Sequence, residues 1–126
     1  MITGGTGAFG KSLVNWLKNN IFDLKEVIIL SRQPEKIFDS FTKSDLPFKI
    51  ILIKHDILSP LALIEKTDYI IHCAAPSGSR LGIEQPKLMR DIIVEGTKNI
   101  LEYSKSVNLK RLLFISSGAV YGEQPA

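Results

Sequence analysis

Short apolar runs alternate along this chain with segments of helical period, and this alternation constrains the fold more than any other feature. The apolar residues within each run are consecutive, as in Val27-Ile28-Ile29-Leu30, which is expected of strands that are covered on both faces. Strands that alternate with helices build βαβ units and a parallel sheet. The pattern therefore predicts an α/β fold with about five parallel strands, at residues 1–3, 26–30, 48–53, 69–73 and 111–116.

The first helix is expected over residues 11–20, between the first two strands. Its apolar residues recur at helical spacing and predict one buried face, and we expect the indole of Trp16 to complete the packing of that face. The residues on this face are Leu13, Val14, Leu17 and, just beyond the helix, Ile21.

The longest helix is expected over residues 88–107. Gly96 in its middle costs about 1 kcal/mol relative to alanine, so it indicates a close approach between this helix and the sheet. Shorter helices are expected after Pro34 and after Pro60, and residues 41–47 are expected to form a loop.

The bulk properties limit the classes of protein that this chain can represent. Its 126 residues suffice for one domain. Its 16 Lys and Arg residues are scattered and its net charge is only +3, which argues against a nucleic-acid partner. The one cysteine, Cys73, lies in an apolar run without metal-ligand spacing, which predicts a buried thiol in a reducing compartment. No apolar run approaches the roughly 18 residues of a membrane span. We therefore expect a cytoplasmic protein with a single domain over residues 1–126, no metal site and no membrane partner.

The most specific motif is Thr3-Gly4-Gly5-Thr6-Gly7-Ala8-Phe9-Gly10, which joins the first expected strand to the first expected helix. Glycines three residues apart allow a tight turn, a close approach of backbone N–H groups to a pyrophosphate, and close packing of the helix on the strand. An ordinary strand-to-helix turn is the alternative, but the flanking elements favour a dinucleotide site. The sheet is then a three-layer, doubly wound sheet of the Rossmann type with strand order 3-2-1-4-5. The candidate cofactor-binding residues in this turn are Gly4, Thr6, Gly7, Ala8, Phe9 and Gly10.

Ser31-Arg32 ends the second expected strand, where NAD-binding domains of this type usually carry a carboxylate for the ribose hydroxyls of adenosine. Without a carboxylate to repel a 2′-phosphate, and with a guanidinium that can donate two charge-assisted hydrogen bonds to it, NADP is favoured over NAD. The serine hydroxyl also suits a phosphate. The alternative is a solvated arginine at the end of a strand.

Two further strand ends carry candidate contacts to the cofactor. Asp56-Ile57 follows the third expected strand, at the rim where the adenine is expected, although Asp56 could equally cap the next expected helix. Ala74-Ala75 follows the fourth strand and would let a flat ligand lie against the backbone. We interpret His72, just before these alanines, as a structural histidine.

Two hydroxyl residues, Ser116 and Ser117, follow the last expected strand. Ligands of open parallel sheets bind at the carboxyl ends of the strands, and a serine there can hydrogen-bond a substrate hydroxyl or carbonyl while a separate residue moves the proton. Serines at strand ends are also common turn formers, so this motif alone makes neither serine catalytic.

Taken together, five ordered motifs resemble the extended short-chain dehydrogenase/reductase family of nucleotide-sugar epimerases and dehydratases. The family's catalytic serine or threonine stands four residues before the tyrosine of the last motif, which implies Ser117, and Tyr121 is then not the catalytic tyrosine. Ile93 departs from the family pattern, which often has asparagine three residues before its Gly-Thr pair. The motifs are Thr-Gly-x-x-Gly-x-x-Gly at 3–10, Asp-Ile at 56–57, His-x-Ala-Ala at 72–75, Gly-Thr-x-Asn at 96–99 and Ser-Ser-x-Ala-Val-Tyr-Gly at 116–122.

The resemblance also implies the activity of an intact protein. Hydride transfer from a nucleotide-sugar substrate to the nicotinamide would give a transient keto-sugar, followed by epimerisation, elimination or reduction. The family's Tyr-x-x-x-Lys pair and most of its substrate-binding part lie further along the chain, so we expect these 126 residues to be an N-terminal portion that is inactive on its own. Family members often pair through helices such as the one expected to end near Val107, which implies a homodimer for the intact protein.

Two alternative functions are compatible with the same residues. One is an NADP-dependent keto-reductase of the same fold that acts on a small carbonyl compound, which only the substrate-binding part would distinguish. The other is a non-catalytic NADP-binding sensor or scaffold, against which Ser117 argues mildly.

Overall fold

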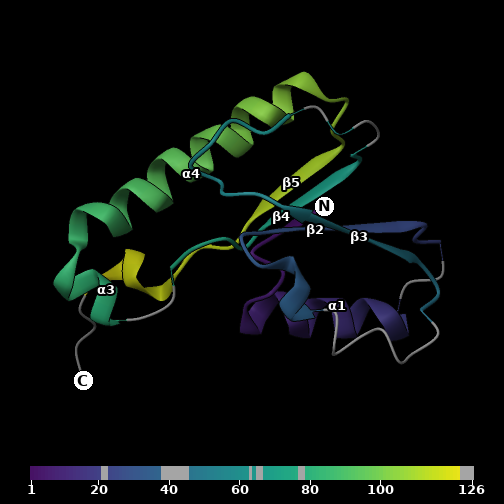
Figure 1. Cartoon of the computed structure of the whole chain (residues 1–126), viewed down its shortest axis with the longest axis horizontal. Coiled ribbons are helices and arrows are strands. Elements are labelled where there is room, and N and C mark those ends of the chain that lie inside the picture. The colour runs from purple at the N-terminus through teal and green to yellow at the C-terminus, as the bar shows by residue number, and fades with distance from the viewer. Residues whose placement is uncertain (21–22, 38–45, 63, 65–66, 77–78, 123–126) are drawn as a thin grey trace.

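The chain folds into one parallel sheet with helices on both faces (Figure 1). A computed structural model describes residues 1–20, 23–37, 46–62, 64, 67–76 and 79–122. Five strands lie in the order β3-β2-β1-β4-β5, and all neighbouring strands run parallel. The predicted fold, strand number and strand order are therefore confirmed. The strands are β1 (Ile2–Thr3), β2 (Glu26–Ser31), β3 (Lys49–Lys54), β4 (Tyr69–His72) and β5 (Arg111–Phe114).

Two long helices, α1 (Ala8–Asn20) and α4 (Pro86–Ser106), cover opposite faces of the sheet (Figure 1). Helix α4 begins two residues before the predicted start because proline is favoured in the first turn, where its missing N–H has no helical partner to lose. The short helix α3 (Ser79–Glu84) was not expected. The helix expected after Pro34 is a single 3-10 turn, η1 (Pro34–Ile37), and a second such turn, η2 (Gly118–Tyr121), follows β5.

The helix expected after Pro60 was wrong for the residues that the structure describes there. Residues 60–62, 64 and 67–68 are not helical. Most of the loop expected at 41–47 lies outside the described residues.

Strand β2 contributes to a hydrophobic core on each face of the sheet. Val27 and Ile29 pack in one cluster with Val14 of α1, whereas Leu30 packs in a second cluster with Ile100 of α4. Alternate residues of a strand point to opposite faces, so two covered faces require consecutive apolar residues. The predicted packing face of α1 is confirmed for Leu13, Val14 and Leu17, whereas Ile21 lies outside the described residues.

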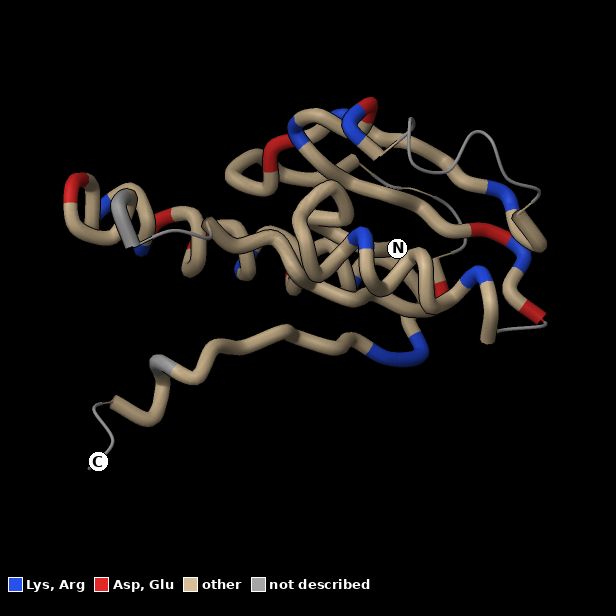
Figure 2. The backbone as a smooth tube through the Cα atoms, turned by 90° about the horizontal axis from the view of Figure 1, so that it is seen from below, with Lys and Arg blue, Asp and Glu red and all other residues tan. Residues whose placement is uncertain are grey.

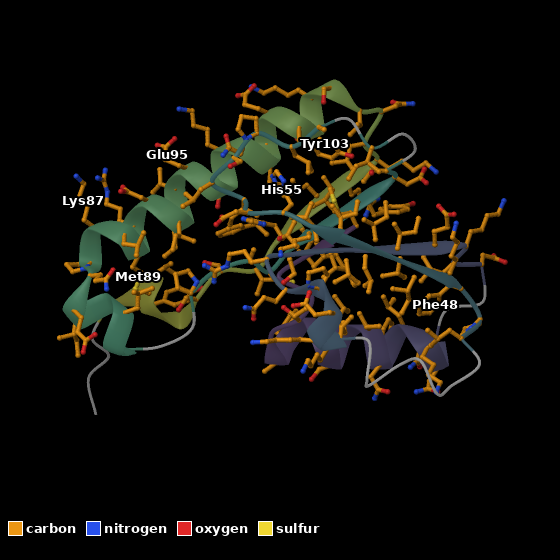
Figure 3. All side chains as sticks on the ribbon, viewed as in Figure 1. Phe48, His55, Lys87, Met89, Glu95 and Tyr103 are labelled. Carbon is orange, nitrogen blue, oxygen red and sulfur yellow. The ribbon has the colours of Figure 1, made fainter. Side chains whose placement is uncertain are left out.

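Helix α4 shows the same division between a buried and an exposed side. Tyr103 lies on the side that faces the sheet and is 3% exposed, whereas the charged side chains of Lys87 and Glu95 lie on the outer side (Figure 3). Helix α4 is therefore amphipathic.

Several apolar residues, among them Trp16, Leu113 and Phe114, are more exposed than the sequence pattern predicted. Trp16 is 53% exposed, so the expectation that it completes the packing of α1 was wrong, because a residue two positions after Val14 does not share its helix face. Leu113 of β5 is 55% exposed. In the described part of the chain, β5 is an edge strand with one face uncovered, although its apolar residues are consecutive.

Gly96 is buried in the middle of α4, and it allows a close approach to the turn that follows β3, not to a strand of the sheet as predicted. A Cβ atom at this position would lie 2.5 Å from Cδ1 of Ile57. Asn99, three residues further along α4, donates from Nδ2 to the backbone carbonyl of Ile57 at 2.8 Å. The Gly-Thr-x-Asn motif thus holds α4 against the turn that contains Asp56 and Ile57.

We expect the effect of Gly96→Ala on the free energy of unfolding to change sign when the residue at position 57 is changed. In the wild-type background the new methyl group overlaps the side chain of Ile57 and should lower the free energy of unfolding by about 1–3 kcal/mol. In an Ile57→Ala background the same change should be neutral or stabilising, since alanine is favoured over glycine in a helix by about 1 kcal/mol. Urea denaturation of the four proteins measures this coupling, and additive effects would contradict it.

Candidate dinucleotide-binding site

The loop between β1 and α1 forms the floor of the candidate site. Gly4 has a φ of +68°, in the left-handed region that favours glycine, and its N–H donates to the carbonyl of Leu30 at 2.9 Å. The N–H of Gly7 donates to the carbonyl of Gly4 at 3.0 Å. A Cβ atom on Gly10 would lie 2.4 Å from Cα of Gly5, so only glycine allows α1 to begin this close to β1. The structure thus shows the tight turn and the close packing that the motif predicts.

A cavity of about 560 Å³ lies over this loop, at the carboxyl ends of the strands. The strand order reverses at β1, which lies between β2 and β4, and open α/β sheets bind ligands at such a switch point. The volume lies within the range of roughly 300–1,000 Å³ found for small-molecule sites. All the candidate cofactor-binding residues line this cavity: Gly4, Thr6, Gly7, Ala8, Phe9, Gly10, Ser31, Arg32, Asp56, Ile57, Ala74 and Ala75.

The beginning of α1 gives one end of the cavity a positive potential. The first N–H groups of a helix have no acceptor within the helix, and the aligned peptide dipoles place a partial positive charge there. The first turn, which starts at Ala8, contains no acidic side chain to neutralise this charge. The arrangement therefore suits a phosphate group.

The end of β2 is joined to the glycine loop by a pair of hydroxyl groups. Oγ1 of Thr6 and Oγ of Ser31 lie 2.8 Å apart in a partly buried position. The backbone N–H of Gln33 donates to the same Ser31 Oγ at 3.2 Å. Arg32, the next residue along the cavity wall, has an exposed side chain.

Asp56 closes a local turn at the end of β3. Its Oδ1 accepts a hydrogen bond from the backbone N–H of Leu58 at 3.1 Å. The described residues after Pro60 form no helix, so the alternative role of Asp56 as a helix cap is not seen. The carboxylate lies in the wall of the cavity, as the position at the strand end predicts.

A buried hydrogen-bond network lies behind the cavity wall and connects β1, β4 and α4. His72 is 2% exposed; its Nδ1 lies 2.6 Å from Oγ1 of Thr3 and its Nε2 lies 3.2 Å from Oγ1 of Thr97. The backbone N–H of Ala74 donates to the same Thr3 hydroxyl at 3.2 Å. Burial lowers the pKa of His72, which favours the neutral ring with one donating and one accepting nitrogen. This geometry supports the interpretation of His72 as a structural histidine.

Cys73, beside this network, has the properties of an inert thiol. It is partly buried, and burial raises its pKa to about 11, so the thiol is protonated at neutral pH. The sequence predicted a buried thiol, whereas the side chain is only partly buried and lines the cavity.

Sequence reasoning missed a second set of residues in the cavity wall. Leu88 and Ile92 are four positions apart on α4 and so share one helix face. A search for apolar residues at this spacing in the first turns after Pro86 could have found them. The additional lining residues are Leu30, His55, Cys73, Pro76, Leu81, Leu88 and Ile92.

Ser117 is not among the residues that line this cavity. It lies in the segment between β5 and η2, and its side chain is exposed. Because all strands are parallel, this segment follows the same carboxyl edge of the sheet as the cavity. The structure thus separates the candidate catalytic serine from the candidate cofactor-binding residues.

Charged residues of both signs are interspersed along the backbone (Figure 2). Within the described part of the chain, no helix has the length and apolar character needed to cross a membrane. Among the described residues there is also no group of three side chains that could hold a metal ion.

A parallel sheet with a glycine turn and a ligand-sized cavity at its switch point is the structure of a Rossmann-type domain. The chain belongs to the NAD dependent epimerase/dehydratase family, whose match extends over residues 1–126. The resemblance inferred from the five motifs is therefore confirmed.

Individual relatives agree with this assignment. A putative UDP-glucose 4-epimerase from Methanocaldococcus jannaschii is 34% identical over 128 residues, covering 98% of this chain and 39% of the relative. Protein CapI from Staphylococcus aureus is 30% identical over 129 residues, covering 97% of this chain and 38% of the relative. The crystal structure of DesIV, a dTDP-glucose 4,6-dehydratase from Streptomyces venezuelae with NAD and TYD bound, matches with a TM-score of 0.83 at 21% identity, over 99% of this chain and 41% of that one. The chain thus spans about two fifths of the length of these proteins.

Proposed function

We propose that this chain is the cofactor-binding part of a nucleotide-sugar epimerase or dehydratase that works through a transient keto-sugar. The observation that carries the proposal is that all twelve candidate residues, chosen from separate motifs, line one cavity at the switch point of the sheet. The relative named as a putative UDP-glucose 4-epimerase supports a nucleotide sugar as the substrate. When bound, the dinucleotide supplies the hydride acceptor for a sugar carbon.

The residues of the cavity fit a dinucleotide. Gly4, Gly7 and Gly10 line the cavity without side chains, so a ligand can approach the backbone there. The first turn of α1 would bind the pyrophosphate, and Asp56 and Ile57 would contact the adenine. Ala75, whose side chain is small and exposed, would let the nicotinamide half lie against the chain after β4.

NADP is the preferred cofactor in this proposal, although the family is described as NAD dependent. A hydroxyl and a guanidinium, those of Ser31 and Arg32, stand at the end of β2, and both residues line the cavity. A guanidinium binds a phosphate through two charge-assisted hydrogen bonds, whereas a ribose hydroxyl offers it a weaker neutral contact. The carboxylate of Asp56 follows β3 and accepts from Leu58, so it does not occupy the position of a ribose-binding carboxylate after β2.

Charge reversal at position 32 tests both the cofactor site and its preference. We expect the 126-residue chain to bind NADPH more tightly than NADH by about tenfold or more, and Arg32→Glu to remove or reverse that preference, since a carboxylate repels a 2′-phosphate. Titration of dinucleotide fluorescence measures both affinities. Arg111→Glu, at the amino end of β5, is the matched control and should leave the ratio unchanged. Binding of neither dinucleotide would contradict the proposed function, and an unchanged ratio in Arg32→Glu would contradict the NADP preference alone.

Ser117 acts on the substrate in this proposal. Its exposed position at the carboxyl edge, outside the cofactor cavity, supports a contact with a sugar hydroxyl or carbonyl. None of Tyr69, Tyr103 and Tyr121 is followed four residues later by lysine. In this proposal a tyrosine and a lysine outside these 126 residues would move the proton.

Two further parts of the proposal concern the intact protein. Val94 and Leu101 are seven positions apart on α4 and more than two fifths exposed, which supports pairing of two copies through this helix. Cys73 is the one cysteine of these 126 residues and cannot form a disulfide within them, which supports a reducing, cytoplasmic location.

A further inference from the structure

Three side chains that are not among the lining residues form a continuous hydrogen-bonded chain behind the cavity wall. Nδ1 of His72 lies 2.6 Å from Oγ1 of Thr3, and its Nε2 lies 3.2 Å from Oγ1 of Thr97. The N–H of Ala74 donates to the same Thr3 oxygen at 3.2 Å. Ala74 itself lines the cavity, and a Cβ atom on Gly4 would lie 2.7 Å from its Cα. The chain of bonds therefore ends where the cavity wall meets the glycine loop.

The protons in this chain can be assigned from the available donors and acceptors. Thr3 is fully buried, and among the described residues its hydroxyl proton has one acceptor, Nδ1 of His72. If Nδ1 carried the ring proton, the hydroxyl proton of Thr3 would have no acceptor, which is costly in a buried position. Thr3 therefore donates to Nδ1. The ring proton is then on Nε2, which donates to Oγ1 of Thr97.

Protonation of His72 would disturb this order at Thr3. Both nitrogens of an imidazolium are donors, so Nδ1–H and the N–H of Ala74 would both face the Thr3 oxygen. The hydroxyl proton of Thr3 would lose its acceptor, and turning the hydroxyl would weaken its bond to His72 or to Ala74. Only the neutral ring lets Thr3 hold Ala74 with every one of these buried donors paired.

The groups that face His72 from the surrounding elements are uncharged. They are Thr3 of β1, Thr97 of α4 and the ring of Phe114 of β5, whose centroid lies 5.7 Å away. The titratable groups close to them in the sequence pair elsewhere or lie on the opposite face of the sheet. The amino group of Met1 donates to the carbonyl of Tyr69 at 2.7 Å, Lys98 pairs with Glu95 at 3.5 Å, and Cys73 and Arg111 point to the other face. None of these groups would compensate a positive charge on His72.

We propose that His72 is a positioning residue of the dinucleotide site, whose neutral ring acts through Thr3 to hold the cavity wall at Ala74 in the form that binds the cofactor. This inference rests on the proposed function and adds a pH dependence to it. A cofactor that packs against Ala74 and Gly4 favours the state in which this wall is fixed. Cofactor binding and protonation of His72 therefore oppose each other, and by linkage each weakens the other to the same extent.

The test measures this coupling from both sides. Isothermal titration of the 126-residue chain with NADP gives the affinity from neutral pH down to the lowest pH at which circular dichroism shows a folded chain. Proton–nitrogen correlation spectra of the histidine rings give the tautomer and the protonation of His72, with and without NADP. The chain has two histidines, and the spectrum of His72→Gln identifies the signals of His72.

We expect the ring proton on Nε2 at neutral pH, and NADP should lower the pKa of His72 further. Across this titration the NADP affinity of the wild type should fall about threefold more than that of His72→Gln. His55 in the cavity wall is kept in both proteins, and the phosphates of NADP are the same in both titrations, so their contributions cancel.

Two substitutions at Thr3 show whether the coupling passes through its hydroxyl. Thr3→Val keeps the branching at Cβ and removes the hydroxyl, so it should weaken NADP binding at neutral pH by about fivefold and abolish the additional loss in acid. Thr3→Ser keeps the hydroxyl and should retain both the affinity and its pH dependence. A merely structural role of Thr3 would leave the pH dependence of Thr3→Val equal to that of the wild type.

The results that would overturn the inference differ from those that would overturn the proposed function. If the wild type binds NADP but its His72 carries the ring proton on Nδ1, or NADP leaves the pKa of His72 unchanged, the positioning role of His72 fails and the proposed function stands. An equal loss of affinity in acid for the wild type and His72→Gln has the same meaning. If the wild-type chain binds neither NADP nor NAD, the proposed function fails, and the inference fails with it.

Discussion

Replacing Gly10 with alanine should abolish dinucleotide binding and lower the free energy of unfolding by about 3 kcal/mol. The new Cβ would lie 2.4 Å from Cα of Gly5, 2.7 Å from its carbonyl carbon and 2.7 Å from the oxygen of Gly4. These are backbone atoms, which cannot rotate away as a flexible side chain can. Helix α1 must therefore move off β1, and the loop that forms the floor of the cavity opens. Circular dichroism should show a melting temperature lower by roughly 10 °C, and NADPH titration should show no binding.

Gly118 provides a matched control for this substitution. A Cβ atom there would meet no atom within 4 Å, and Gly118 does not line the cavity. Gly118→Ala should keep both the melting temperature and the affinity for NADPH. A Gly10→Ala protein that also kept both would show that the close packing of α1 on the loop is not required.

The second large effect is expected at His72. His72→Phe leaves the hydroxyls of Thr3 and Thr97 without their ring partner, and Thr3 is fully buried, so the free energy of unfolding should fall by about 2–4 kcal/mol. His72→Gln keeps a donor and an acceptor and should lose less. Urea denaturation at neutral pH measures both losses, and equal losses in the two variants would contradict a role for the hydrogen bonds.

The same histidine predicts the direction in which stability depends on pH. Because burial lowers the pKa of His72 below its ordinary 6.5, the unfolded chain takes up the proton first as the pH falls. The stability associated with the neutral ring is therefore complete above pH 6.5 and is lost between pH 6.5 and the lower pKa of the folded state, by up to about 1.4 kcal/mol per pH unit. Between about pH 7 and pH 5 the wild type should lose more stability than His72→Gln. The amino group of Met1, with a pKa lowered to about 6, titrates in this range in both proteins and cancels in the comparison.

Most of the fold could be predicted because its signals are local. Val27 to Leu30 are apolar without interruption, and this continuity follows directly from cover on both faces of β2. The same pattern wrongly predicted that Leu113 is buried. Leu113 lies on an edge strand, and the sequence of a strand does not show whether other elements cover it. Trp16 was also wrongly predicted to be buried, for a different reason. The prediction relied on its large apolar side chain, although its position on the helix does not face the sheet.

The candidate site divides along similar lines. The glycine turn and Ser31-Arg32 were found because strand ends and glycine spacing are visible in the sequence, and parallel topology then brings them to one edge. Leu81 was missed because its place in the cavity wall depends on how α3 folds back toward the sheet. The hydrogen bond between Thr6 and Ser31 joins residues 25 positions apart, so it could be found only in the structure.

In the glycine loop, the positions that fix the backbone conformation differ from the positions whose side chains can contact a ligand. A side chain at Gly4 would overlap the backbone at Ala74, and one at Gly10 would overlap the loop itself. Thr6, Ala8 and Phe9 alternate with these glycines or follow them, line the same cavity and are at least partly exposed. These three positions can therefore accept other side chains and also contact a ligand. A small combinatorial library at these positions could change the cofactor preference while the fold stays intact.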